Sequence, residues 1–521
     1  MRDQFTLSVV QAALDSAAEE MFEVLRKTAM SPIIYEVLDV GTGITAADGS
    51  LVSSGAGIPS FVGVLDKSVK AILAKQGDDI FDGDVFLTND PNYGGVTHLN
   101  DVVVAEPVFF EGTLIAWVAS IAHWGDIGGS TPGSMATNVT GIIAEGLRLP
   151  IVRLFSKGER NDAVADIIST NSRLPDFVTG DLWAQVSAGR RAAQLIRNLT
   201  ERYGVGTLRD AIADAQATGL ARAQKGLADL PKGTFDVEQQ QDDGSVWRAS
   251  ITITDEKFTI DLRDAPDQTE GPYNTCHDGA LVACQILFKA LTDPERYANA
   301  GSFTPLEVMT RPGSIFNPTA DAAHGYYFET RIRLIDMLWR GLAERAGVNL
   351  PAGSFASIFG VVIAGEHPDT GRKYTMVEPQ MGGWGATSER SGNDAMFSTN
   401  HGDTFNCPIE VAEARYGFEV IEKKLGSSLA VDGENSGGRG VQTRYRMRGR
   451  GVMSAGFSHG VVPVWALPNA AEGGCNSLAI TRDGNVDIQP TFVSKLALQP
   501  GDEFKIETAR GGNARSGALI D

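Results

Sequence analysis

Two long apolar runs, separated by a short polar break, form the clearest pattern of hydrophobic positions along this chain. Residues 102–110 and 113–122 are rich in Val, Ile, Phe and Trp, and Glu111-Gly112 lies between them. β-Branched and aromatic residues favour strands, and a pair containing glycine between two such runs is typical of a tight turn. The pattern predicts a β-hairpin.

Apolar residues at spacings of three and four predict helices on the N-terminal side of this hairpin. A stripe of Val, Leu and Met indicates an amphipathic helix over residues 6–28, and a further helix is expected over 63–75. Between them, residues 33–40 have the composition of a strand, which would carry Glu36 and Asp39 toward a glycine-rich turn.

In the rest of the chain the hydrophobic pattern changes several times between helical spacing and alternation. Helical spacing returns in three runs, then alternation predicts a β-meander, two further helices follow, and glycine becomes dense after Pro351. We therefore expect an α+β fold of several domains, with mixed and antiparallel sheets, a helical insert and a β-rich C-terminal half. The expected boundaries are 1–157 for an α/β domain that holds the hairpin, 158–230 for the helical segment, 231–370 for the β-meander with its helices, and 371–521 for a glycine-rich β domain.

Composition narrows the class of protein. The 521 residues are 42% hydrophobic and 21% charged, which is ordinary for a globular protein with proper cores. A net charge of −20 argues against nucleic acid or an anionic membrane surface as the main partner, because both attract clustered Lys and Arg. The four cysteines have neither metal-site nor disulfide-scaffold spacing, and no apolar signal core or bilayer-length stretch is seen. We expect a cytoplasmic protein with reduced thiols.

Two polar segments at the ends of the expected hairpin are the candidates for chemistry. Residues 88–101 and 122–129 concentrate His, Asp and Gly, with His98 and Asp101 entering the first strand and His123 leaving the second. Imidazole and carboxylate together suit divalent Zn, Mn or Fe, and glycine lets the backbone turn tightly enough for short side chains to converge. The same residue types also serve as ordinary turn residues, so the composition alone leaves both interpretations open.

The register of the hairpin decides whether these side chains can meet. With a strict two-residue loop, Asp101 lies opposite Ala122, and the side chains of Asp101 and His123 point to opposite faces. A three-residue loop or one bulge brings Asp101 opposite His123, with Cβ atoms about 5 Å apart. Pro107 cannot donate to a ladder and is a natural place for such an irregularity.

The motifs N89-D-P-x-x-G-G-x-T-H-L-x-D101, A122-H-W-G-D-I-G-G129 and S31-P-I-I-Y-E-V-L-D39 resemble the hydantoinase B family. Its members include the metal subunits of ATP-dependent hydantoin and lactam hydrolases, of oxoprolinases, and of acetone and acetophenone carboxylases. Looser similarity at 271–274, 381–385 and 436–440 extends the resemblance over essentially the whole chain.

The resemblance implies a set of site residues. It places Glu36, His98, Asp101 and His123 around one divalent metal ion, manganese or zinc with iron as a further candidate, and Asp39 is the alternative first carboxylate. Asp126 is the candidate for proton transfer, or else supports the metal ligands from outside.

The resemblance also implies a partner and a reaction. A hydantoinase A-like large subunit would use ATP and Mg²⁺ to phosphorylate a small cyclic amide, and this chain would complete the hydrolysis at its metal centre, in an α2β2 assembly. The absence of a Walker A sequence from this chain agrees with ATP being handled elsewhere. The alternatives are a subunit of an acetone-type or acetophenone-type carboxylase, or a structural subunit whose metal only stabilises the hairpin.

Overall fold

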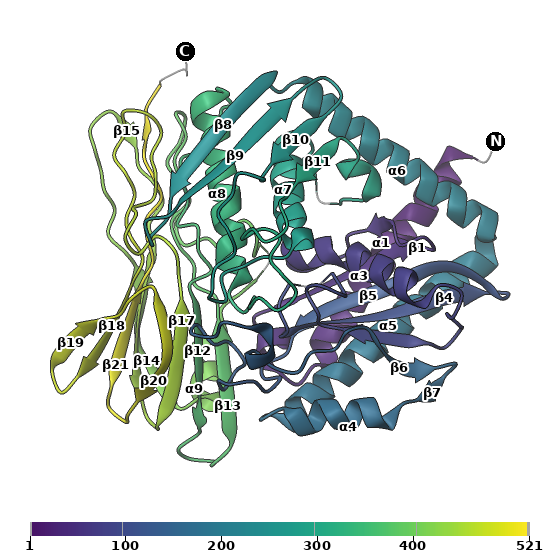
Figure 1. Ribbon diagram of the computed structural model, residues 1–521, viewed down its shortest axis with the longest axis horizontal. Coiled ribbons are helices and arrows are strands. Elements are labelled where there is room, and N and C mark those ends of the chain that lie inside the picture. The colour runs from purple at the N-terminus through teal and green to yellow at the C-terminus, as the bar shows by residue number, and fades with distance from the viewer. Residues whose placement is uncertain (1–2, 96, 296, 403, 518–521) are drawn as a thin grey trace.

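The computed structural model describes residues 3–95, 97–295, 297–402 and 404–517. Figure 1 shows an N-terminal sheet with its helices on the right, a helix and sheet layer in the middle and upper part, and the C-terminal sheets on the left. Helices and mostly antiparallel strands thus build several sheet-centred regions, which confirms the expected α+β, multi-domain class.

The N-terminal region is a single antiparallel sheet. Its strands, in sheet order, are β2 (Leu51–Ser53), β1 (Val40–Ala46), β5 (Thr113–His123), β4 (Asp101–Phe110), β3 (Val85–Thr88), β6 (Val152–Ser156) and β7 (Glu159–Arg160). The predicted hairpin is its centre. Both its strands are buried on both faces, which explains why they are continuous apolar runs.

Helices cover the two faces of this sheet. Val103, Trp117 and Ile121 pack with α3 on one face, whereas Val102 and Val118 join the core under α1 and α5 on the other. The helices are α1 (Gln4–Thr28), α3 (Pro59–Gln76), α4 (Asp162–Asn171), α5 (Pro175–Tyr203) and α6 (Val205–Ala228). The three helices predicted within 158–230 are confirmed, and they pack on α1 and the N-terminal sheet.

The middle region is a four-stranded sheet with two helices. Its strands, in sheet order, are β11 (Leu306–Met309), β10 (Phe258–Asp261), β9 (Val246–Ile253) and β8 (Gly233–Gln240), so β8 to β10 form the predicted meander. Its helices are α7 (His277–Thr292) and α8 (Tyr327–Arg345). Helix α8 takes in the buried Tyr327 and Phe328 at its start, as part of its apolar face.

The C-terminal region consists of two larger antiparallel sheets and a short ribbon. One sheet runs β13 (Lys373–Glu378), β12 (Gly360–Glu366), β17 (Gly451–Gly456), β20 (Phe492–Leu498), and the ribbon pairs β15 (Glu434–Asn435) with β22 (Ala514–Arg515). The other runs β14 (Phe418–Leu425), β16 (Val441–Met447), β21 (Glu503–Glu507), β18 (Ser477–Arg482), β19 (Asn485–Ile488), and α9 (Ile409–Arg415) precedes it. Because β12 pairs with β13 and β17, this region begins before the predicted boundary at residue 370.

The segment expected to be a strand over 33–40 is the clearest error. Residues Pro32–Tyr35 form a short helix, α2, and β1 starts only at Val40. Proline at the first helical position has its φ angle preset for a helix and lacks only an N–H that would have no partner there, so Pro32 starts a helix where we expected a strand to begin.

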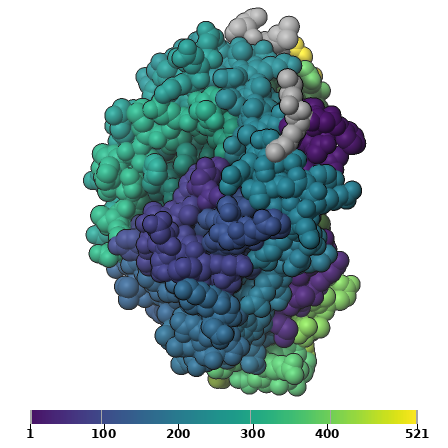
Figure 2. Space-filling view, turned by 90° about the vertical axis from the view of Figure 1, so that its right-hand side faces the viewer, coloured from purple at the N-terminus to yellow at the C-terminus, as the bar shows by residue number. Residues whose placement is uncertain are grey.

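The face in Figure 2 is formed by the N-terminal region, in purple and blue, and the middle region, in teal and green, with C-terminal residues in light green and yellow along the right and lower edges. None of the helices in the described part of the chain combines the length and hydrophobicity that crossing a bilayer demands.

Candidate metal centre

The hairpin register brings the candidate side chains together. Glu111 and Gly112, both with positive φ, close a two-residue turn, and a bulge after Val108 shifts the pairing by one residue. Asp101 therefore lies directly opposite His123, as the bulged alternative requires. The bulge falls beside Pro107 rather than at it.

A third strand extends this row. Val40 of β1 pairs with Ala122, so the preceding residue, Asp39, lies beside His123, whose backbone N–H donates to the Asp39 carbonyl at 3.1 Å. Residues directly opposite one another on neighbouring strands point to the same face. Asp39, His123 and Asp101 thus form a row across three strands.

His98 completes the group from the loop before β4. Its Nε2 lies 3.0 Å from Oδ1 of Asp101 and 3.3 Å from Nδ1 of His123, and that Nδ1 lies 3.2 Å from the same Asp101 oxygen. Nδ1 of His123 is also 3.9 Å from Oδ2 of Asp39. All four side chains are buried.

Neighbouring groups fix the orientation of two of these side chains. The Nδ1–H of His98 donates to the Gly325 carbonyl at 3.0 Å, which leaves the lone pair of a neutral ring on Nε2, facing the cluster. The second oxygen of Asp101 accepts hydrogen bonds from the hydroxyls of Thr97 and Tyr327. The first oxygen is therefore the one directed at both imidazoles.

Burial and mutual charge set the electrostatics. Burial opposes ionisation of Asp101, but His98 and His123 outweigh it and hold its pKa well below the usual range. Burial, and then the Asp101 charge, raise the pKa of Asp39 well above its ordinary value. Burial lowers the pKa of His123, whereas for His98 the carboxylate of Asp101 overcomes burial and raises the pKa. A cation among these groups would relieve the repulsion between the two carboxylates.

The donor geometry fits a divalent metal ion. Ligand atoms about 2.1 Å from one ion lie roughly 3.0–3.4 Å from each other in octahedral or tetrahedral arrangements. The three separations within His98, Asp101 and His123 are 3.0, 3.2 and 3.3 Å. Oδ1 of Asp39 and Nε2 of His123 are buried without a hydrogen-bond partner in the described structure. His98, Asp101 and His123, with Asp39 beside them, could hold the ion.

Glu36 does not join this group. It caps the C-terminus of α2, three residues before Asp39, and it is absent from the residues that surround the cluster. The early end of α2 and the late start of β1 explain the difference, because only Asp39 is next to the paired strand. The arrangement favours Asp39, the alternative, as the first carboxylate.

Asp126 has a structural environment. Its carboxylate oxygens accept hydrogen bonds from the backbone N–H groups of Gly128, Gly133 and Arg173, at 2.9–3.0 Å, and from the Arg173 guanidinium at 3.0 Å. Because these donors occupy both oxygens of a fully buried carboxylate, the geometry favours a role in holding the loop after β5 over the predicted proton transfer.

A small chamber of about 40 Å³ adjoins the cluster, and three residues that sequence reasoning missed line it. Nε and Nη1 of Arg331, both polar side-chain atoms of Asn400, and Nε2 of His401 are buried without partners in the described structure. The Arg331 guanidinium lies 4.9 Å from the Tyr327 ring centre. Burial lowers the pKa of His401 to about 3, so this imidazole is neutral. Unpaired buried donors are costly, so their presence around one chamber indicates a polar ligand.

This chain is similar to known proteins over nearly its whole length. The hydantoinase B/oxoprolinase family profile matches residues 3–513. Caprolactamase subunit beta of Pseudomonas jessenii is 27% identical over 98% of this chain and 90% of its own length. The crystal structure of the ATP-dependent caprolactamase from the same organism superposes with a TM-score of 0.90 at 24% identity, over 99% of this chain and 91% of that one.

A nucleotide-free acetone carboxylase structure superposes with a TM-score of 0.86 at 17% identity, over 99% of this chain and 76% of that chain. At these identities the two structures establish a shared fold. The match of the family profile over nearly the whole length decides the family, and this chain belongs to the hydantoinase B/oxoprolinase family.

Proposed function

We propose that this chain is the metal-binding subunit of an ATP-dependent cyclic amide hydrolase. In this proposal an ATPase-like partner subunit phosphorylates a hydantoin, oxoproline or lactam ring, and this chain completes the ring opening. The observation that carries the proposal is the meeting of His98, Asp101 and His123 beside a chamber whose other wall presents unpartnered polar groups.

The chain's own residues have separable tasks in this proposal. His98, Asp101, His123 and Asp39 hold the ion, and when bound it supplies Lewis acidity, which polarises a carbonyl or phosphoryl oxygen and eases deprotonation of water. Arg331 donates to the negative charge that develops on the substrate, because its Nε and Nη1 are unpartnered beside the cluster. Asn400 and the neutral His401 orient the substrate by hydrogen bonds.

Two features support a partner subunit. The relative from P. jessenii is named as the beta subunit of a caprolactamase, and the sequence of this chain holds no Walker A motif. A cyclic amide is resonance-stabilised, so phosphorylation of its oxygen by ATP elsewhere would make the ring carbon a better electrophile. We infer a hydantoinase A-like large subunit and an α2β2 assembly.

Co-expression tests the proposal. The chain purified alone should contain about one equivalent of manganese, zinc or iron by elemental analysis and hydrolyse no ATP. With its large subunit it should show ATP hydrolysis that depends on an added ring, screened with hydantoin, 5-oxoproline and caprolactam. ATP turnover by the isolated chain that persists at constant specific activity through further purification would contradict the division of labour.

The likeness to acetone carboxylase keeps carboxylation as a second candidate. Labelled bicarbonate separates the two, because only a carboxylase incorporates its carbon into the product. A purely structural metal is separated by chelation, since a structural ion stabilises folding but its loss leaves turnover intact.

A further inference from the structure

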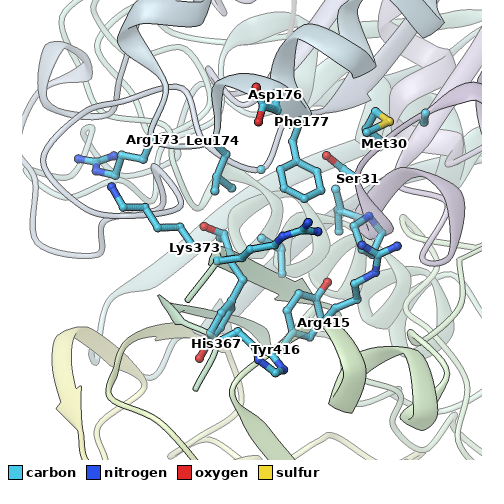
Figure 3. A pocket seen from close by; sticks show the side chains of 18 of the residues that line it. Met30, Ser31, Arg173, Leu174, Asp176, Phe177, His367, Lys373, Arg415 and Tyr416 are labelled. Atoms are coloured by element: carbon cyan, nitrogen blue, oxygen red, sulfur yellow. The ribbon is translucent and has the colours of Figure 1, made fainter. Parts of the chain in front are cut away.

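A second cavity, of about 710 Å³, has none of the metal-cluster residues in its lining. Its walls come from both halves of the chain: the α1–α2 junction and the start of α5 on one side, and the β12–β13 hairpin with α9 on the other. Figure 3 shows Leu174 and Phe177 above the cavity, Tyr416 below it, and Lys373 and Arg415 on opposite sides. Its volume suits a small organic ligand.

The charge of this cavity is opposite to that of the protein. Arg372, Lys373 and Arg415 line it, and no ion pair between described residues involves any of them. A fourth cation, Arg173, is already paired with Asp126, and Asp176 is the one carboxylate among the lining residues. Among the described lining residues, three cations without an ion-pair partner thus face one carboxylate, and in a chain of net charge −20 they make a local site that attracts anions.

Buried polar and apolar side chains further restrict the kind of ligand that fits this cavity. His367 is 94% buried, and its Nε2 has no hydrogen-bond partner in the described structure although the residue lines the cavity. Its Nδ1 accepts from the Asp369 N–H at 3.2 Å, so Nε2 carries the proton and is a donor. Leu174, Phe177 and Val377 supply apolar surface beside these donors. The lining thus combines cationic and neutral donors with room for an organic group.

The cavity adjoins the metal chamber. Val377 lines both, and Gly125 at the cavity wall is two residues beyond His123. A ligand in the larger cavity would therefore lie close to the metal cluster without contacting the residues that form it.

We propose that this cavity binds the phosphate group of a small molecule. Arg372, Lys373 and Arg415 neutralise the phosphate, since guanidinium groups match its oxygens in bidentate geometry, and His367 donates from the cavity wall. The ligand arrives either as an organic phosphate, whose apolar part rests on Leu174 and Phe177, or as free inorganic phosphate. The proposal goes beyond the metal centre and does not depend on which ring the enzyme opens.

Calorimetric titration of the full chain, at constant ionic strength, tests this with two probes: inorganic phosphate and phenyl phosphate. Both should bind the wild type, and the double variant Arg372→Gln/Arg415→Gln should weaken binding at least tenfold. Lys373→Gln alone should weaken it by a smaller factor. The matched control is Arg209→Gln/Arg222→Gln, which removes two exposed arginines from α6 and should bind as the wild type does.

The two probes separate the two sources of phosphate. Tighter binding of phenyl phosphate identifies an organic phosphate as the ligand, and equal affinity identifies free phosphate. No binding of either probe to the wild type, or equal binding to wild type and the Arg372/Arg415 double variant, overturns the proposal. Metal content should be the same in all variants, so failure of this site is distinguishable from failure of the metal centre.

Discussion

The two walls of the metal chamber are built in different ways. The first holds Asp39, His123 and Asp101 in one row across three paired strands, with His98 three residues from Asp101 in sequence. The second takes Arg331 from the second turn of α8 and Asn400 and His401 from a loop about seventy residues later. The first wall is local and set by strand register, whereas the second depends on how the middle and C-terminal regions dock onto the N-terminal sheet.

The largest effect is expected from breaking the first wall. His98→Ala and His123→Ala should each remove the metal, measured by elemental analysis, and lower turnover by at least about 10³-fold, because the ion loses an imidazole ligand. The fold should persist by circular dichroism. His277→Ala, which removes a histidine at the start of α7, is the matched control and should keep the metal. Full metal retention in both His98→Ala and His123→Ala would remove the site from this hairpin.

Breaking the second wall should separate activity from stability. Arg331→Met should retain the metal but lower turnover about 100-fold, because it removes a donor from the substrate rather than a ligand from the ion. The free energy of unfolding, from urea titration, should stay level or rise, since a buried guanidinium whose Nε and Nη1 have no hydrogen-bond partner is replaced by an apolar chain of similar length. Metal loss in Arg331→Met, or a fall in stability of several kcal/mol, would show that the two walls are not separable.

Variants of Asp39 and Glu36 test which of the two carboxylates belongs to the first wall. Asp39→Asn should weaken metal affinity by about tenfold or more, because Asp39 lies beside His123 in the strand row. Glu36→Gln is the matched variant and should bind the metal as the wild type does, since Glu36 lies outside the cluster. Competition with a chelating dye measures both. The reverse ranking would restore Glu36 as the first carboxylate.

The difference between the walls also explains what the sequence could predict. Two continuous apolar runs and the turn residues between them identified the hairpin, and only two registers were open, so the meeting of Asp101 and His123 followed from one bulge. The choice between Glu36 and Asp39 depended on whether 33–40 was strand or helix, and Pro32 decided that locally. Asn400 and His401 stood in a glycine-rich loop without periodicity, and no local rule relates such a loop to a strand about 300 residues earlier.

The smallest effect on turnover is expected at Glu106, on β4 but away from the cluster. Burial raises the pKa of its carboxyl to about 7, despite Arg197 with Nη2 3.7 Å away. The pKa of Glu106 is higher in the folded state than in the unfolded chain, where a glutamate has a pKa of about 4.3. Its contribution to the free energy of unfolding is therefore fully present below about pH 4.3 and is lost as pH rises through about 7. Glu106→Gln has no ionisation to lose, so it should match wild type near pH 4.5 and be more stable above pH 7 by about 1–3 kcal/mol.

Urea unfolding of wild type and Glu106→Gln between pH 4.5 and 8 measures this difference. Metal content and turnover should be equal in the two proteins, because Glu106 touches neither wall of the chamber. The opposite trend, with wild type gaining on Glu106→Gln as pH rises, is the behaviour of a carboxylate whose pKa is lowered by an ion pair. It would mean that Arg197 lowers the pKa of Glu106 by more than burial raises it. The hairpin would then carry a negative charge at Glu106 at neutral pH.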